Sequence, residues 1–198
     1  MISHKADILR ALVRPAAASS DFDLNPEFAR RVAPVRDAGV LVPLIERSSG
    51  VHLVLTKRAA HLAAHPGQIA FPGGKRDAQD VDITATALRE AYEETGLSPE
   101  LVRVLGHLPS HETVTGFKVT PTIGWISGPW QVKADPGEVE EVFEVPLRHV
   151  LHLANFHVQK RIWNGQNRAY YTVPYGPYYI WGATARILRG FAEQMRAP

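Results

Sequence analysis

Residues 80–97 read DVDITATALREAYEETGL, and this stretch decides the fold. It predicts a helix over residues 83–95, because Asp82 offers a carboxylate for the first turn and Gly96 suits the left-handed residue that ends many helices. Apolar residues along the stretch give the helix one apolar side, namely Ala85, Ala87, Leu88 and Ala91. The sequence therefore predicts an amphipathic helix with defined ends.

The same helix carries three carboxylates on one edge. At about 100° per residue, Glu94 lies about 40° from Glu90 on one side and Glu93 about 60° from it on the other. Arg89, one turn before Glu93, offsets only part of this charge. Such a cluster is typical either of a solvated helix face or of a site for Mg²⁺, which binds carboxylate oxygens and leaves room for phosphates.

Outward from this helix, the sequence predicts a single α/β domain around a mixed sheet, because strands and helices mix without regular alternation, repeat or linker. We expect further helices at residues 4–14 and 179–195, and a short one ending near Pro34. The expected strands are residues 39–46, 51–57, 103–108, 118–126 and 142–145, and a hairpin of 156–163 with 169–173 across a turn at 164–167. Residues 1–38 are expected to form a helical extension packed on the domain of residues 39–198.

Composition narrows the classes of function. The 198 residues are 45% hydrophobic and include no cysteine, which excludes a disordered chain, a disulfide scaffold, thiolate zinc sites and cysteine nucleophiles. A net charge of +2 predicts no general nucleic-acid surface. The first apolar stretch, residues 8–13, is far shorter than the ~18 residues of a membrane helix, so we expect a cytoplasmic protein without a membrane partner.

Residues 74–97 resemble the Nudix box, G-x5-E-x7-R-E-U-x-E-E-x-G-U, in which U is aliphatic. With Ala91 accepted at the first U, the second half matches at Arg89, Glu90, Glu93, Glu94, Gly96 and Leu97. The first half departs from the pattern. Counted forward from Gly74, the first acid falls on Asp80, whereas counted back from Arg89 it falls on Val81, so one residue is inserted and the role of the first acid stays open.

The residues before the box narrow the resemblance. Residues 53–58, LVLTKR, and 65–74, HPGQIAFPGG, are similar to the signature of the coenzyme A pyrophosphatase branch of the Nudix hydrolases, apart from Ala59 where serine is frequent. That branch also commonly has an acid at the position of Asp80 and the same added residue. The similarity extends from about Gly39 onward, and it implies a Nudix-type α/β/α sandwich around a mixed sheet.

The resemblance also implies a reaction, the hydrolysis of a nucleoside-linked diphosphate with Mg²⁺ or Mn²⁺ as cofactor. For coenzyme A or an acyl form of it, the products would be 3',5'-ADP and 4'-phosphopantetheine or its acyl form. The implied metal ligands are the Gly74 carbonyl and the carboxylates of Glu90, Glu93 and Glu94, with Arg89 orienting the glutamates. Glu138 is preferred over Glu140 and Glu141 as a further ligand or general base, although ion pairing is an equal interpretation for each of these downstream acids.

The expected partner is a small nucleotide of the coenzyme A type. Arg58, His65 and Gln68 are the substrate-binding candidates, since they supply charge and hydrogen-bond donors, and loop structure is their other interpretation. Three aromatic residues either stack adenine or pack the predicted hairpin, namely Trp163, Tyr170 and Tyr171. The sequence leaves the oligomeric state open, a homodimer included.

Other enzyme classes lack a necessary residue. His61 and His65 are spaced like a helical zinc pair, but no glutamate follows His61 and Pro66 would end the helix. A P-loop ending at Gly74 and Lys75 would need a glycine at position 69, where the chain has Ile69, and Ser or Thr at position 76, where it has Arg76. The motif G-x-S-x-G of the α/β-hydrolases is absent from the sequence.

Two alternatives stay open beside coenzyme A hydrolysis. The same box would also serve ADP-ribose, NADH or another nucleoside diphosphate derivative. From a different class, a non-catalytic Nudix domain would bind nucleotides or RNA, and the basic, aromatic run at residues 159–171 is compatible with this. The intact carboxylate set of the box argues against such a loss of catalysis.

Overall fold

The structure is a computed structural model, and it describes residues 5–28, 34–163 and 165–196. Its helices are α1 (Lys5–Leu12), α2 (Ile83–Thr95), α3 (Leu147–Val150) and α4 (Ala183–Arg196), with 3₁₀ turns η1 (Pro99–Leu101) and η2 (Leu153–Asn155). Its strands are β1 (Ser19–Ser20), β2 (Arg36–Arg47), β3 (Gly50–Arg58), β4 (Ile69–Ala70), β5 (Gly73–Lys75), β6 (Val102–His107), β7 (His111–Glu112), β8 (Phe117–Ile126), β9 (Val139–Pro146), β10 (His157–Trp163) and β11 (Gln166–Thr172).

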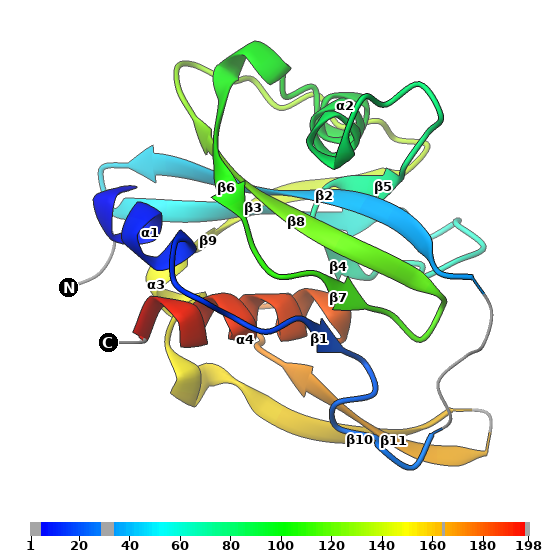
Figure 1. Cartoon of the computed structure of the whole chain (residues 1–198). Coiled ribbons are helices and arrows are strands. Elements are labelled where there is room, and N and C mark those ends of the chain that lie inside the picture. The colour runs from blue at the N-terminus through cyan, green and yellow to red at the C-terminus, as the bar shows by residue number, and fades with distance from the viewer. Residues whose placement is uncertain (1–4, 29–33, 164, 197–198) are drawn as a thin grey trace.

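The elements form layers. Figure 1 shows helix α2 above a mixed sheet, α4 below it, and the hairpin β10–β11 below α4. Within the described residues the main sheet has nine strands, β1 to β9, and β10 with β11 forms a separate two-stranded sheet. The expected α/β/α sandwich around a mixed sheet is therefore confirmed. No helix in the described part of the chain is long and apolar enough to cross a membrane.

Strand β2 organises the sheet. It runs parallel to β8 and antiparallel to β3 and β5, so it pairs with the expected hairpin partner and with the strand before α2. Its side chains alternate between faces. Leu41 and Ile45 pack with the apolar side of α2, whereas Val42 and Leu44 join the larger core that includes α4. This strand begins at Arg36, ahead of the expected domain start at residue 39, and that division stays a prediction.

Helix α2 has the predicted ends. The Asp82 carboxylate accepts a hydrogen bond from the Ala85 N–H at 2.8 Å, and Gly96, with φ of 70°, donates its N–H to the Tyr92 carbonyl at 2.8 Å. Both contacts satisfy backbone groups that a helix end leaves unpaired. The predicted bounds of residues 83–95 are therefore confirmed.

Two predicted elements near the C-terminus are wrong in extent. The last helix begins at Ala183 rather than at residue 179, because Ile180 accepts the Val173 N–H at 2.8 Å and Gly182 has φ of 65°. These contacts hold residues 180–182 beside the end of β11. The turn of the hairpin is shorter than expected, since Gln166 already pairs with Trp163 across the two strands.

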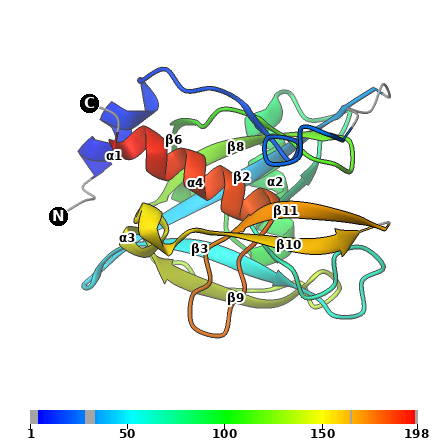
Figure 2. The ribbon, with the colours of Figure 1, turned by 90° about the horizontal axis from the view of Figure 1, so that it is seen from below.

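The N-terminal segment spans the molecule. Helix α1 packs on α4, where the Gln194 amide donates to the Ala11 and Arg14 carbonyls at 3.0 and 3.2 Å. The chain then pairs β1 with β7 and reaches the hairpin through turns at residues 21–28, as Figures 1 and 2 show. Of the expected short helix that ends near Pro34, residues 27–28 form a turn and a bend, and residues 29–33 lie outside the described residues.

Candidate active site

Arg89 is the centre of an ionic network at the middle of α2. Its Nε and Nη2 donate to the two carboxylate oxygens of Asp80, each at 3.0 Å. Its Nη1 donates to Glu90 at 2.9 Å and to Glu93 at 3.0 Å, which is the expected orientation of the glutamates by this arginine. The arginine thus holds two of the box glutamates and one acid from the loop before the helix.

The inserted residue before α2 places Asp80, not Val81, in this network. Asp80 is buried, and it also accepts hydrogen bonds from the Asp77 N–H at 2.9 Å and the Thr86 hydroxyl at 2.8 Å. The Arg89 guanidinium, together with these donors, holds the pKa of Asp80 well below its usual range, although burial opposes the shift. Val81 is 86% exposed, so counting forward from Gly74 finds the acid that Arg89 binds.

Two glycines allow α2 to approach the sheet closely. Gly39 on β2 and Gly74 on β5 pair with each other across the strands. A Cβ atom at Gly39 would lie 2.5 Å from the Ile83 carbonyl oxygen, and one at Gly74 would lie 2.5 Å from the carboxyl carbon of Glu90. The backbone of β5 at Gly74 therefore lies directly against the carboxylate of Glu90, and the Gly74 carbonyl stays a predicted metal ligand.

We expect Gly39→Ala to destabilise the fold by about 1–3 kcal/mol, because the added methyl group would force α2 away from β2. Gly190→Ala in α4 is the matched control, since the nearest atom to its Cβ would be 3.8 Å away. The control should be neutral or gain up to about 1 kcal/mol from helix propensity. Urea unfolding measures both, and equal stability of the two variants would contradict the close approach.

Glu94 is the buried acid of the box. It is 4% exposed, and its carboxylate accepts a hydrogen bond from the Gly73 N–H at 3.3 Å. Burial, with the nearby negative charges of Glu138 and Glu90, raises the pKa of Glu94 to about 8, and the Arg58 charge offsets part of this rise. Burial also raises the pKa of Glu90, against the opposing effect of Arg89. A cation beside these two carboxylates would relieve both penalties.

The three downstream acids have different surroundings. Glu138 lies close enough to Glu90 and Glu94 that its charge raises the pKa of each. In contrast, Glu140 pairs with Lys57 at 2.7 Å, and Glu141 accepts a hydrogen bond from the Tyr178 hydroxyl at 2.6 Å. Glu138 is therefore the downstream acid that joins the carboxylate cluster.

The donor set matches a hard divalent cation in chemistry. Within the described ranges no three His, Asp or Glu side chains are arranged to hold a metal ion as they stand. Arg89 uses one oxygen each of Glu90 and Glu93, and Gly73 uses one oxygen of Glu94, so these bonds leave the second oxygen of each carboxylate for another partner. Carboxylate and backbone carbonyl oxygens are the ligands that Mg²⁺ and Mn²⁺ prefer.

A cavity of about 670 Å³ lies beside β5, and Gly73 of this strand is part of its wall. Gly73 and Arg58 connect it with the acids, since both line the cavity and both affect the Glu94 carboxylate. The three expected substrate-binding residues, Arg58, His65 and Gln68, lie together in its wall. The Nε of Arg58 is buried with no hydrogen-bond partner among the described residues, and His65 adopts a left-handed φ of 56°. Unpaired donors and strained backbone are typical of binding sites.

Another part of the cavity wall joins aromatic residues that the sequence had named with residues that it had not. Tyr170 and Tyr171 line the cavity, as expected for one of their two interpretations, whereas the side chain of Trp163 lies outside the described residues. Trp181 stands edge-on to Tyr170 at 5.3 Å, with the Arg161 guanidinium 5.0 Å from its ring. The wall also includes Asp21, Asn25, Arg161, Arg168, Trp181 and Arg186. For Arg161 and Arg168 the only signal in the sequence was the basic, aromatic run at residues 159–171.

Comparison with known proteins identifies the family. The sequence model of the NUDIX domain matches residues 35–168. The chain belongs to the Nudix family. It is 43% identical over 175 residues to an uncharacterized Nudix hydrolase, NudL, from Enterobacter sp. (strain 638), covering 87% of this chain and 89% of the relative. NudL of Salmonella dublin is 42% identical over 174 residues, with the same coverage of both chains.

Solved structures agree on the fold. The chain matches a MutT/nudix family protein from Enterococcus faecalis with a TM-score of 0.52 at 16% identity, over 96% of this chain and 73% of that one. It also matches RenU, a Nudix hydrolase from M. smegmatis, with a TM-score of 0.51 at 23% identity, over 62% of this chain and 77% of that one. Membership in the Nudix family and the identity of 43% to a Nudix hydrolase indicate the activity: the protein is a pyrophosphatase that hydrolyses a nucleoside diphosphate derivative, and its family typically uses a divalent metal.

Proposed function

We propose that this Nudix hydrolase cleaves the diphosphate bond of coenzyme A or a derivative, and releases 3',5'-ADP and 4'-phosphopantetheine or its acyl form. The observation that carries the proposal is the shared wall formed by Arg58, His65 and Gln68. These residues belong to the sequence signature that is similar to the coenzyme A pyrophosphatase branch. They meet beside Gly73, whose N–H contacts the buried acid of the box.

The residues on and around α2 have different roles in the proposed reaction. Mg²⁺ or Mn²⁺, when bound, neutralises phosphate oxygens and lowers the pKa of the attacking water. Glu90, Glu93 and Glu94 with the Gly74 carbonyl would hold the metal, and Arg89 keeps the first two of these glutamates in place. Glu138 is the candidate for a further ligand or for the base that takes the proton of the water.

The cavity suits the remainder of such a substrate. Its volume of about 670 Å³ falls within the range of about 300–1,000 Å³ that small-molecule sites occupy. Arg58 supports binding of phosphate oxygens, because its buried Nε has no hydrogen-bond partner among the described residues. Tyr170 and Trp181 offer aromatic rings to a base.

A substrate panel tests the proposal. With Mg²⁺ present, we expect coenzyme A to be hydrolysed with a higher kcat/KM than ADP-ribose or NADH, because only coenzyme A carries the pantetheine arm and the additional phosphate. Chromatography of the products measures this. Preferred turnover of ADP-ribose or NADH, or the absence of 3',5'-ADP from the coenzyme A reaction, would reject coenzyme A in favour of another nucleoside diphosphate derivative.

A further inference from the structure

Residues 19–25 contribute to the cavity although they precede the part of the chain that matches the NUDIX domain. Ser20, Asp21 and Asn25 line its wall. They reach it from β1, which pairs with β7 of the main sheet, and Figure 1 shows this segment passing from the sheet to the hairpin β10–β11. The segment therefore connects the main sheet with the hairpin β10–β11.

Asn25 makes the contact with the hairpin. Its side chain is 2% exposed, its Oδ1 accepts the Ala169 N–H at 2.7 Å, and its Nδ2 donates to the Ala169 carbonyl at 2.9 Å. The same Nδ2 donates to the Asp21 carbonyl at 3.0 Å. The amide therefore pairs with the outer edge of β11 as a neighbouring strand would, with one donor and one acceptor facing the same residue.

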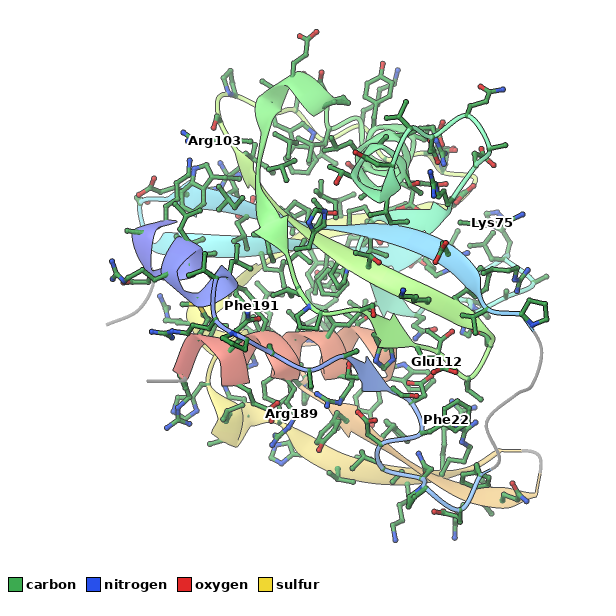
Figure 3. The ribbon with its side chains drawn as sticks, viewed as in Figure 1. Phe22, Lys75, Arg103, Glu112, Arg189 and Phe191 are labelled. Atoms are coloured by element: carbon green, nitrogen blue, oxygen red, sulfur yellow. The ribbon has the colours of Figure 1, made fainter. Side chains whose placement is uncertain are left out.

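The segment itself is anchored to the main sheet, so Asn25 has a fixed position. The Asp21 carboxylate bonds the buried His111 at 3.2 Å and accepts the Val114 N–H at 2.9 Å. Phe22 adds a second contact to the hairpin, because the Arg168 guanidinium lies 5.8 Å from its ring, and Figure 3 shows Phe22 between β1 and the hairpin. Buried bonds on one side and the amide pair on the other make a rigid link.

The hairpin needs such a link. It has only two strands, and an isolated two-stranded sheet is marginally stable in water. Ala169 precedes Tyr170 and Tyr171 directly, and both tyrosines line the cavity. A change in the position of β11 would therefore move the aromatic wall, while the carboxylates of α2, on the opposite face of the sheet, would stay in place.

We propose that Asn25 is a positioning residue for substrate, which holds the aromatic wall of β11 against the nucleoside end of the bound molecule. It sets KM and has little influence on kcat, because it acts through Ala169 and is remote from the α2 acids. The inference rests on the proposed function only in taking the cavity as the substrate site. It holds for whichever nucleoside diphosphate derivative the enzyme hydrolyses.

The test is a comparison of Asn25→Ala with Asn155→Ala in the full chain, using the panel substrate that the parent protein turns over fastest. Asn155 is a matched control, because its amide donates to the His149 carbonyl at 2.8 Å and is not part of the cavity wall. Loss of the amide pair is expected to raise KM about tenfold with kcat within about twofold. The control should change neither constant by more than about twofold.

Asn25→Asp provides a second variant, since it keeps the acceptor for the Ala169 N–H and loses the donors to the carbonyls of Ala169 and Asp21. We expect its KM also to rise, with kcat again preserved. An unchanged KM in either folded variant, or a fall in kcat with KM unchanged, would overturn the inference. It would equally be overturned if both variants failed to fold while Asn155→Ala folded, because the role of Asn25 would then be structural. Absence of turnover by the parent protein on the whole panel would instead reject the proposed function.

Discussion

Glu94→Gln is expected to lower the metal-dependent kcat by about a thousandfold, since losing several kcal/mol of charge stabilisation at the metal corresponds to about three powers of ten in rate. Glu94 is the most buried acid of the box, and its carboxylate lies against Gly73 at the boundary between the acid cluster and the cavity. Glutamine keeps the size of the side chain and removes the negative charge. Steady-state kinetics with Mg²⁺ and Mn²⁺ measure the loss.

Glu140→Gln is the matched control for this experiment. Glu140 lies on β9 and pairs with Lys57 at 2.7 Å on the neighbouring strand, and the variant should keep near-normal kcat. A near-normal kcat in Glu94→Gln itself would contradict the metal-binding role of the box acids. An equal loss in both variants would show a general effect of removing negative charge.

A comparison of the melting temperatures of the parent and of Glu94→Gln at different pH values shows whether the variant has kept the fold. In the metal-free parent the pKa of Glu94 rises from its ordinary value of 4.5 to about 8, so the folded state holds a proton that the unfolded state releases. The stability of the parent should therefore fall as pH rises from about 4.5 through about 8. Glutamine cannot ionise, so the folded variant should have the higher melting temperature at about pH 9 in the presence of a chelator.

Arg89→Ala is expected to destabilise the protein by about 3–5 kcal/mol, because removing one partner of a buried ion pair leaves the other charge unpaired. Asp80 would lose two hydrogen bonds from the guanidinium while its side chain stays 6% exposed. Glu90 and Glu93 would lose the cation between them. Urea unfolding at neutral pH measures the change.

The control for the arginine is Arg47→Ala at the end of β2. Arg47 bonds Glu144 at 2.5 Å, with side chains 44% and 31% exposed, so its loss should cost no more than about 1 kcal/mol. A similar loss of stability in the two variants would contradict the central place of Arg89. The difference should also shrink in acid, because the stability that Asp80 gains from a lowered pKa is lost as pH falls through that pKa.

Local patterns predicted α2 completely. Asp82 and Gly96 bound the helix through contacts within four residues, and the spacing of the glutamates follows from helix geometry alone. Counting along the box gave two positions for the first acid, that of Asp80 and that of Val81, and the spacing alone could not decide between them. That choice depends on how the loop before the helix closes over Arg89, where the carboxylate of Asp80 meets both the guanidinium and the Thr86 hydroxyl.

Tertiary structure decided how differently the three glutamates behave. The sequence places them on one edge, but Glu94 is 4% exposed against the sheet whereas the Glu93 side chain is 56% exposed. The burial of Glu90 and Glu94 depends on the close approach of α2 to β2 and β5, which Gly39 and Gly74 allow because they have no side chains. The periodicity of a helix cannot predict these differences in burial, because they arise from contacts between elements distant in sequence.

The sequence by itself thus determined the Nudix box, the capped helix that carries it, the mixed sheet around it and the signature residues at one end of the cavity. Only the tertiary structure decided that residues 20–25 line the same cavity, where Asn25 bonds Ala169 of β11 across 144 residues of chain. The physical reason is the range of the interactions. Caps and helical spacing act within one or two turns, whereas a cavity forms where distant backbone edges, such as that of Ala169, find a hydrogen-bond partner.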